Sequence, residues 1–485
     1  MKRVFFPIAI LCMVISVVVR LQGLNAPVAD WHSWRQADTA AVARNFIRLG
    51  IDILHPRYDD LSNIQSGKDN PQGWRMVEMP LYQATAVFVW RIFPHMSIES
   101  ILRLLSVLSV ALSILLLGLL LREFIDEKTA MIGMFLYAIL PFSIFYGRSI
   151  LPDSFAVFWA LSSLVFLARA TSSRVWLLWV VLAGVSGGVS VLVRPMAVFL
   201  LVPAVYLLGR LGSVKEKSIS FLVYGLLVCI PLYYWRQWIL QFPEGIAVSD
   251  WLYNKANIRF KGAWFYWLFA KRFGELILGY WGLILFGMGM VVKNTKRERM
   301  FSALWFLGGL LYLVIFAGGN VQHDYYQALL LPITIWFLAK GAGYLLTAQK
   351  DISKFGSMAL VTVTIGFMWA FSWYSIRSYF WINRPEIIEA GKKADEILPK
   401  NAKIIAPYNG DTTFLYQANR QGWPLGFDID KKISMGATHY VTVSPTDADL
   451  ETRDLASMYT VLVRNDTYAI IDLTKVNPSV KTVIK

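Results

Sequence analysis

The stretch 101–121 reads ILRLLSVLSVALSILLLGLLL and carries a single charged residue, Arg103. A run of about 20 apolar residues is what a helix needs to cross a bilayer core of about 30 Å. The whole chain shows the same bias, because 56% of its residues are hydrophobic and only 16% are charged, against about 25% charged in soluble domains. The sequence therefore predicts an integral membrane protein.

Similar apolar segments recur along the first four fifths of the chain. They predict eleven membrane-spanning helices, at 4–20, 101–121, 129–147, 154–170, 175–193, 196–209, 218–240, 277–292, 301–317, 326–346 and 357–379. A weaker apolar segment, 80–93, is short and carries Trp90 and Arg91 near its end. Whether it crosses the membrane decides the sidedness of everything that follows.

The distribution of Lys and Arg decides this question, since short cytoplasmic loops carry an excess of both. If 80–93 does not cross and the N-terminus is cytoplasmic, all short basic loops fall on one side; their residues are Arg122, Lys128, Arg169, Arg174, Arg210, Lys215, Lys217, Lys293, Lys296, Arg297, Arg299, Lys350 and Lys354. The segment is therefore predicted to be an interfacial or re-entrant helix. The net charge of +15 is then assigned to loops beside anionic lipid rather than to nucleic-acid binding.

Three long segments are predicted on the outer face of a bacterial inner membrane. They are the first outer loop 21–100, a second loop 241–276 and the tail 382–485. The tail is more charged and contains short β-like runs after a helical stretch at 385–398, which is typical of a small α/β domain. The predicted domains are thus a transmembrane domain, 1–381, and an extracytoplasmic domain, 382–485.

The first outer loop opens with the polar run DWHSWRQADT at residues 30–39. Apolar residues recur at helical spacing from 36 to 49, which predicts a helix along the membrane surface. Arg35 and Asp38 are three residues apart and share a face of that helix. A surface ion pair with an aromatic anchor is the plainer interpretation, but Asp30, His32, Arg35 and Asp38 together favour a functional site.

Two further clusters lie at the outer ends of predicted spans. Arg148 and Asp153 flank the start of the fourth span, where Asp153 alternatively serves as a helix N-cap. Arg194 ends the fifth span and Pro195 starts the next. An Arg at that depth either extends its side chain toward the interface or binds a lipid phosphate.

The run QHDYYQ at residues 322–327 lies at another outer span end. His323, Tyr325 and Tyr326 carry groups that donate hydrogen bonds to phosphate or sugar oxygens. An aromatic belt at the membrane interface explains tyrosines equally well. It does not explain His323 and Asp324.

The fifth cluster opens the non-crossing segment, with Glu78 and Tyr82 in the run EMPLYQ at residues 78–83. Glu78 is interpreted either as a helix-start carboxylate or as a ligand for substrate or a divalent metal. The metal requirement stays open at this point, and no other cofactor is predicted.

In this order, the clusters resemble those of the GT-C superfamily of membrane glycosyltransferases, in the branch of the protein O-mannosyltransferases and aminoarabinose transferases (bacterial glycosyltransferase family 39-like). The matching pieces are the acidic first loop, the run 78–82, Arg148 to Asp153, the VRP run 193–195 and His323 to Tyr326. The resemblance covers roughly residues 1–350. It implies a GT-C fold with interfacial helices on the outer side.

The resemblance also implies the reaction and its partners. Such enzymes transfer a sugar from a polyprenyl-phosphate donor to an acceptor hydroxyl, typically with inversion, in glycosylation of cell-envelope glycan, lipid or protein. A first-loop carboxylate is then the general base, and Asp153 orients the acceptor or the loop. Arg194, with His323 and Tyr325, stabilises the leaving phosphate.

This sequence departs from the family pattern in the first-loop helix. Counted back from Arg44, the usual Asp-Glu positions hold Arg35 and Gln36, and the usual Arg position holds Asp38. The general base is therefore Asp38 or Asp30, with a modest preference for Asp38. Because relatives often have Lys at position 79, which is Met here, phosphate binding must depend on Arg194, Arg35 or the basic loop 255–272.

Two other classes of function compete with a hexosyl- or pentosyltransferase. A transporter or flippase for a lipid-linked sugar predicts charges inside the spans and repeat symmetry, and a scaffold predicts that the acidic residues are dispensable. Neither the sugar nor the acceptor follows from the sequence. The transferase hypothesis requires Asp38, Asp153 and Arg194 to converge at the outer rim of the bilayer.

Overall fold

The structure is a computed structural model that describes residues 4–292, 295–347 and 353–477. It contains two compact units. The helical unit comprises Met1–Leu24, Ser100–Gln237 and Ser249–Tyr379, and the loop-and-sheet unit comprises Asn25–Glu99, Trp238–Val248 and Phe380–Lys485. The predicted boundary at 381 thus falls beside the last junction, whereas the first outer loop groups with the C-terminal sheet rather than with the spans.

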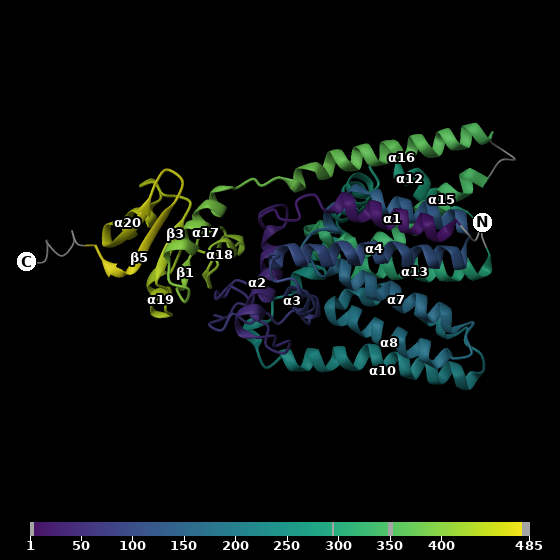
Figure 1. Cartoon of the computed structure of the whole chain (residues 1–485), viewed down its shortest axis with the longest axis horizontal. Helices are drawn as coiled ribbons and strands as arrows, with labels where there is room; N and C mark the ends of the chain where they lie inside the picture. The colour runs from purple at the N-terminus through teal and green to yellow at the C-terminus, as the bar shows by residue number, and fades with distance from the viewer. Residues whose placement is uncertain (1–3, 293–294, 348–352, 478–485) are drawn as a thin grey trace, which may run out of the picture. The chain divides into compact units, whose positions relative to one another are not determined.

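The helical unit consists of α-helices joined by short 3-10 and π segments (Figure 1). Its elements are α1 (Phe5–Arg20), α4 (Ile98–Phe124), α5 (Glu127–Ile139), α6 (Pro141–Tyr146), α7 (Asp153–Ala170), α8 (Trp176–Val193), η1 (Pro195–Leu201), α9 (Ala204–Leu208), α10 (Val214–Ile239), η3 (Asp250–Leu252), η4 (Lys255–Phe260), α11 (Gly262–Phe265), η5 (Tyr266–Ile277), α12 (Gly282–Val291), α13 (Lys296–Ile315), α14 (Ala317–Gln322), η6 (Asp324–Leu330), α15 (Leu331–Thr347), α16 (Lys354–Ile376) and η7 (Arg377–Phe380).

Among the described residues, seven helices are long and apolar enough to cross a membrane, or eight if one bent pair counts as a span. The predicted number of eleven is therefore not confirmed. The shortfall has local causes, since α1 has only 16 residues and two predicted spans are interrupted by proline. Pro141 ends α5 at Ile139, and Pro203 separates η1 from α9, because proline lacks an amide donor and disfavours a helical residue before it.

The bent pair joins the helix Gly262–Ile277 to Gly282–Val291 at an angle of 113°. The turn passes through Gly279, whose φ is +47°, and Tyr280, whose φ is +57°. A side chain at Gly279 would place its Cβ 2.2 Å from the carbonyl oxygen of Met368. Glycine is therefore required here both for the left-handed backbone and for the close approach of α16.

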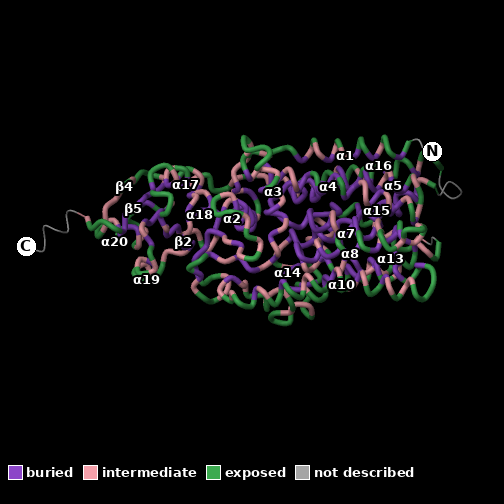
Figure 2. The backbone as a smooth tube through the Cα atoms, turned by 60° about the horizontal axis from the view of Figure 1, so that its bottom comes forward, coloured by how far each residue is buried: buried purple, intermediate pink, exposed green. Residues whose placement is uncertain are grey.

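Burial separates central from peripheral helices (Figure 2). In the apolar window of the η6–α15 span 89% of residues are buried, against 22% in α10. Two glycines allow α12 and α15 to pack backbone against backbone. A Cβ on Gly289 of α12 or on Gly341 of α15 would lie 1.9 Å from a carbonyl oxygen of the other helix. Small residues that let two backbones approach are the usual interface of membrane helices.

The side chain of Arg20 bridges the break between α5 and α6 by hydrogen bonds to both helices. Its guanidinium donates to the carbonyl oxygens of Tyr137, Ala138 and Ser143 at 3.2, 2.9 and 3.2 Å, and to the hydroxyl of Ser143 at 2.7 Å. The last carbonyls of a helix have no partner within it, so this buried Arg satisfies those of Tyr137 and Ala138 at the end of α5.

We expect Arg20→Met to lower the free energy of unfolding by about 2–4 kcal/mol, since the buried carbonyl groups of Tyr137 and Ala138 lose this donor. The thermal unfolding midpoint in detergent measures this loss. Arg210→Met, at an exposed position beside Tyr206, is the matched control. Equal midpoints for the two variants would contradict the assigned role.

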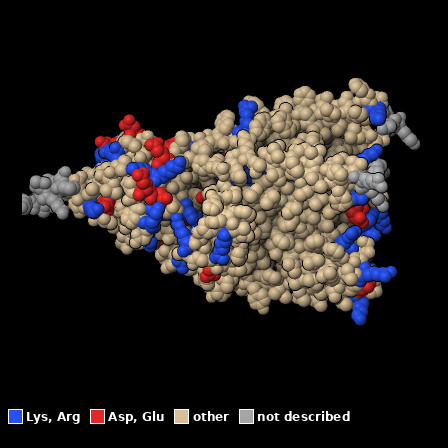
Figure 3. Space-filling model, viewed as in Figure 1, with Lys and Arg blue, Asp and Glu red and all other residues tan. Residues whose placement is uncertain are grey.

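Basic side chains gather at one end of the helical unit (Figure 3). They lie in or after the last turns of α4, α7 and α9 and in the first turns of α5, α10, α13 and α16; the residues are Arg122, Lys128, Arg169, Arg174, Arg210, Lys215, Lys217, Lys296, Arg297, Arg299 and Lys354. Lys293 and Lys350 lie outside the described residues. The end at which these loops meet is the one that the positive-inside bias would place in the cytoplasm.

The loop-and-sheet unit contains a five-stranded sheet of order β2-β1-β3-β5-β4. Strands β2, β1 and β3 are parallel, and β5 is antiparallel to both of its neighbours. The elements of this unit are α2 (Ser33–Leu49), α3 (Leu81–Ile92), η2 (Pro243–Gly245), α17 (Glu386–Ile397), β1 (Ile404–Ile405), α18 (Thr413–Gln417), β2 (Gly422–Trp423), α19 (Ile429–Ser434), β3 (His439–Thr442), α20 (Leu450–Met458), β4 (Tyr459–Arg464) and β5 (Ala469–Val476).

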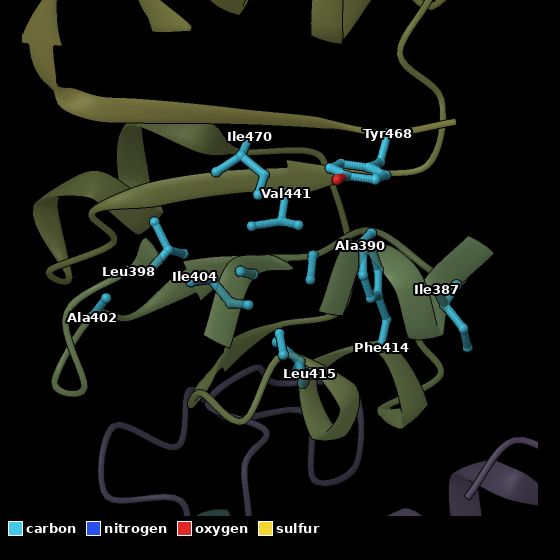
Figure 4. Packing of buried hydrophobic residues seen from close by; sticks show 13 residues of the cluster. Ile387, Ala390, Leu398, Ala402, Ile404, Phe414, Leu415, Val441, Tyr468 and Ile470 are labelled. Carbon is cyan, nitrogen blue, oxygen red and sulfur yellow. The ribbon is translucent and has the colours of Figure 1, made fainter. Parts of the chain in front are cut away.

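The predicted C-terminal α/β domain is confirmed. One face of the sheet packs against α17 and α18 through Ile387, Ile404, Phe414, Val441 and Ile470, which are all buried (Figure 4). Strand β2 was not predicted, because two residues carry no periodicity that a sequence could reveal.

The first outer loop extends this sheet. Asp60 forms a parallel bridge with Gly422 of β2, and the amides of Leu61 and Gly422 donate to the carbonyl oxygens of Gly422 and Asp59 at 2.8 and 2.9 Å. Within the same unit α2 packs on α3 and α18. Helix α3 has 12 residues, about 18 Å, which agrees with the prediction that 80–93 does not cross.

Candidate active site

Asp153 and Arg194 form an ion pair between the start of α7 and the end of α8. The Nε atom of Arg194 lies 3.0 Å from Oδ1 of Asp153, and both side chains are buried. Pro152 occupies the N-cap position, so Asp153 is the first helical residue rather than the cap. A carboxylate there is favoured by the positive end of the helix dipole.

Aromatic rings cover the same Arg194. Its guanidinium carbon lies 4.9 Å from the ring centre of Tyr326 and 5.8 Å from that of Tyr325. His323 stacks on both rings, with centroids 5.4 Å from Tyr325 and 6.0 Å from Tyr326. The hydroxyl of Tyr312 fixes the backbone by donating to the carbonyl oxygen of Tyr326 at 3.1 Å. Five residues predicted from separate motifs, Asp153 among them, are thus brought together in the helical unit.

A second polar group in the helical unit was missed by sequence reasoning. The hydroxyls of Tyr146 and Tyr379 donate to the two carboxylate oxygens of Asp324, each at 2.5 Å. Arg272 lies 3.6 Å from the same carboxylate. Arg272 belongs to the basic loop 255–272 that the sequence had singled out, whereas nothing marked the two tyrosines among so many aromatic residues.

Arg148 is placed at the N-terminal side of α7. It is buried, its guanidinium carbon lies 5.3 Å from the ring centre of Phe145, and Nη1 is 3.5 Å from the carbonyl oxygen of Gly23. This places Arg148 against the residues that follow α1, in the same unit as the Asp153–Arg194 pair.

In the loop-and-sheet unit, Arg35 and Asp38 have separate partners. Arg35 forms a buried salt bridge with Glu78, and Asp38 pairs with Arg75 at 3.0 Å. The hydroxyl of Thr412 donates to Oδ1 of Asp38 at 2.7 Å. The helical spacing of Arg35 and Asp38 is as predicted, but the sequence could not show the ion partners of either residue, which come from the next part of the loop.

Asp38 is enclosed. Only 1% of the residue is exposed. Burial raises the pKa of the Asp38 carboxyl above its usual range, although Arg75 and the hydrogen bond from Thr412 favour the charged form. One carboxylate oxygen faces a guanidinium and the other a hydroxyl, so both oxygens have partners within the chain.

Asp30 lies in a different setting. It accepts a hydrogen bond from Nε2 of Gln36 at 2.6 Å and lines a pocket of about 240 Å³ together with His32, Trp34 and residues of the C-terminal domain. His32 precedes α2 in a left-handed conformation, with φ of 56°. Unlike Asp38, Asp30 therefore borders a space that can hold a ligand.

Glu78 and Tyr82 flank the start of α3. Tyr82 is fully buried in the first turn, and Glu78 pairs with the guanidinium of Arg35. In the part of the chain that the structure describes, no group of three or more His, Cys, Asp and Glu could hold a metal ion.

Asp60 is a buried acid at the edge of the sheet. Burial raises its pKa to about 6, opposed by hydrogen bonds from Ser62. Because its pKa is higher in the folded state than the usual 3.8, the folded chain binds the proton more tightly. The contribution of Asp60 to the free energy of unfolding is therefore fully present at low pH. It is lost as pH rises from about 4 to 6, which lowers the free energy of unfolding by up to about 3 kcal/mol.

We expect Asp60→Asn to remove that loss and to be more stable than the wild type above pH 6, because the neutral amide needs no proton. The measurement is the unfolding midpoint of both proteins from about pH 4 to about pH 8, a range that spans the shift. The difference between them should grow as pH rises toward 6 and then level off. A difference that is independent of pH would contradict the raised pKa.

The helical unit also contains an apolar cavity of about 290 Å³. Its lining comes from η5, α12, α13 and η6–α15, and includes Phe269, Phe286, Phe306, Leu313 and Ile333. The lining has almost no polar surface. Such a cavity suits a hydrocarbon chain rather than a hydrated ligand.

Comparison with known proteins finds one matching family model and several solved structures of similar fold. Residues 77–235, which contain Glu78, Asp153 and Arg194, match the family model of dolichyl-phosphate-mannose-protein mannosyltransferases. ArnT from Cupriavidus metallidurans, solved with undecaprenyl phosphate bound, is 13% identical over 97% of both chains, with a TM-score of 0.65. The chain has the GT-C glycosyltransferase fold.

Two solved structures of the Archaeoglobus fulgidus oligosaccharyltransferase are also similar to this chain. The apo form is 12% identical over 90% of this chain and 69% of its own, with a TM-score of 0.58. The complex with an inhibitory peptide and a dolichol-phosphate is 12% identical over 97% and 74%, with a TM-score of 0.56. No curated protein sequence matches the chain.

The predicted resemblance to GT-C enzymes is thus confirmed, as is the fold of apolar helices with a small C-terminal sheet domain. The matched family and the structurally similar proteins are glycosyltransferases, which confirms the predicted enzyme class. The roles of single residues stay predictions, since the comparisons do not test them.

Proposed function

We propose that this chain transfers a sugar from a polyprenyl-phosphate donor to an acceptor hydroxyl, with inversion at the anomeric carbon. The observation that carries the proposal is the buried Asp153–Arg194 pair under the rings of Tyr325, Tyr326 and His323. The pair orients a guanidinium, the side chain best suited to hold a phosphate through two parallel hydrogen bonds.

The donor is assigned to the helical unit. Arg194 binds the phosphate, His323 and Tyr325 donate further hydrogen bonds to it, and the apolar cavity lined by Phe269 and Phe286 takes part of the prenyl chain. Charge builds on the phosphate oxygen as its bond to the sugar breaks. Preoriented donors at that point lower the barrier because they need no reorganisation.

The general base is assigned to Asp30 rather than to Asp38. Asp30 borders a pocket, whereas Asp38 is enclosed between Arg75 and Thr412. In the reaction the base takes the proton of the acceptor hydroxyl and the acceptor oxygen bonds to the anomeric carbon. The bond from that carbon to the phosphate oxygen breaks, and polyprenyl phosphate leaves with the electron pair.

The proposed location is a bacterial inner membrane, with the N-terminus cytoplasmic and the C-terminal domain outside. Support comes from the basic residues collected at one end of the helical unit (Figure 3), which the positive-inside bias assigns to the cytoplasm. The acceptor is a hydroxyl of a cell-envelope glycan, a lipid or a protein.

The test is release of polyprenyl phosphate from defined polyprenyl-phosphate sugars by the purified chain in liposomes with cell-envelope acceptors. We expect acceptor-dependent release of the lipid phosphate from at least one donor. Intact donors that move between leaflets without release would instead support a flippase, the alternative that the matched family does not favour.

A further inference from the structure

A pocket in the loop-and-sheet unit is built from two stretches that are far apart in sequence. Residues 29–34, before and within the first turn of α2, form one wall, and Asn383, Arg384, Tyr408 and Asp411 form the other. Its volume of about 240 Å³ lies below the range of about 300–1,000 Å³ that is usual for drug-sized ligands. The pocket is therefore suited to a single ring-sized group.

The lining combines flat apolar surfaces with hydrogen-bond acceptors. Trp31, Trp34 and Tyr408 supply aromatic rings, and Asp30 and Asp411 supply carboxylates. Charged carboxylates only accept hydrogen bonds, so their counterpart is a ligand rich in O–H donors. A pyranose ring has this combination, since its hydroxyls surround an apolar face of C–H groups that packs on aromatic rings.

The wall from the C-terminal domain is fixed in place. The amide of Thr413 donates to Oδ1 of Asp411 at 2.7 Å, and the amide of Tyr408 donates to the carbonyl oxygen of Pro424 at 3.0 Å. The guanidinium of Arg384 lies 5.6 Å from the Tyr408 ring centre and is paired with Glu386. A preorganised wall lowers the entropy lost on binding.

We infer that this pocket binds a sugar ring of the acceptor, so that the acceptor is a glycan and the C-terminal domain selects it through Tyr408 and Asp411. That the bound sugar belongs to an acceptor rests on the proposed function. The two carboxylates of the lining outnumber its one guanidinium, Arg384, which is already paired with Glu386, so the pocket disfavours anionic ligands. Its volume is too small for an extended peptide.

The experiment uses the full chain in lipid nanodiscs without donor, and saturation-transfer NMR with the methyl glycosides of glucose, galactose, mannose and N-acetylglucosamine. A serine- and threonine-containing hexapeptide is the competing probe. We expect at least one glycoside to bind and the peptide not to bind. Tyr408→Ala and Asp411→Asn should weaken that glycoside about tenfold, the scale of one lost aromatic or hydrogen-bond contact.

Asp454→Asn, at an exposed acid of α20 in the same domain, is the matched control and should bind as the wild type does. Asparagine at 411 keeps the oxygen that accepts from Thr413, so that variant tests the charge and not the turn. Absence of binding by every glycoside, binding of the peptide alone, or equal binding by the variants would overturn the inference. Glycoside binding without any use of lipid-linked donors would overturn the proposed function and leave the sugar site standing.

Discussion

Replacing Arg194 with alanine is expected to reduce kcat/KM for the polyprenyl-phosphate sugar by about 100- to 1,000-fold, the usual effect of removing one preoriented charge-stabilising group. The change removes the guanidinium that would hold the departing phosphate and that packs under Tyr326. The measurement is the initial rate of lipid-phosphate release at several donor concentrations. Binding of polyprenyl phosphate itself should weaken in parallel.

This variant also leaves the buried Asp153 without its cation, so a loss of folding must be separated from a loss of chemistry. The double variant Asp153→Asn with Arg194→Gln removes both charges and leaves no buried ion alone. We expect it to unfold near the wild-type midpoint and still to be inactive. A folded double variant with wild-type kcat/KM would contradict the role of Arg194.

Asp30→Asn is expected to lower kcat by about 10²- to 10⁴-fold, the range for loss of a general base. Donor binding should not change, because the donor is assigned to the helical unit. The asparagine oxygen can still accept from Gln36, so the turn before α2 is kept. Single-turnover rates at saturating donor report the loss directly.

Asp38→Asn is the companion variant, and a different result is expected from it. Arg75 would lose its buried counter-ion, which costs about 3–5 kcal/mol in comparable sites, and the unfolding midpoint should fall. If Asp38→Asn instead folds normally and abolishes transfer while Asp30→Asn remains active, the base is Asp38 and the present assignment is wrong.

The sequence predicted those parts of the fold that follow from local patterns. Apolar runs located the long helices such as α4 and α8, and the helical spacing after position 36 located α2. Interruptions within predicted spans were missed at Pro141 and Pro203, because overall hydropathy stays high across a break in the helix. The sharp turn at Gly279 was missed for the same reason.

The sequence predicted which residues belong to the candidate site but not which side chains they pair with. The order of the motifs along the chain grouped Asp153, Arg194 and His323, and the fold brings these three together. The partners of Asp38 could not be foreseen, since Arg75 lies 37 residues away and Thr412 lies 374 residues away. No local pattern connects positions at such separations.

The bridge between Asp60 and Gly422 bears on the order in which the protein matures. The first loop is synthesised early, yet its edge pairing, the ring of Tyr416 over Arg44 and the hydroxyl on Asp38 all come from residues after 411. During translation the first outer loop therefore cannot form these contacts until nearly the whole polypeptide has been synthesised. A ribosome that stalls before that point leaves complete membrane helices with a first outer loop that lacks its partners in the C-terminal domain.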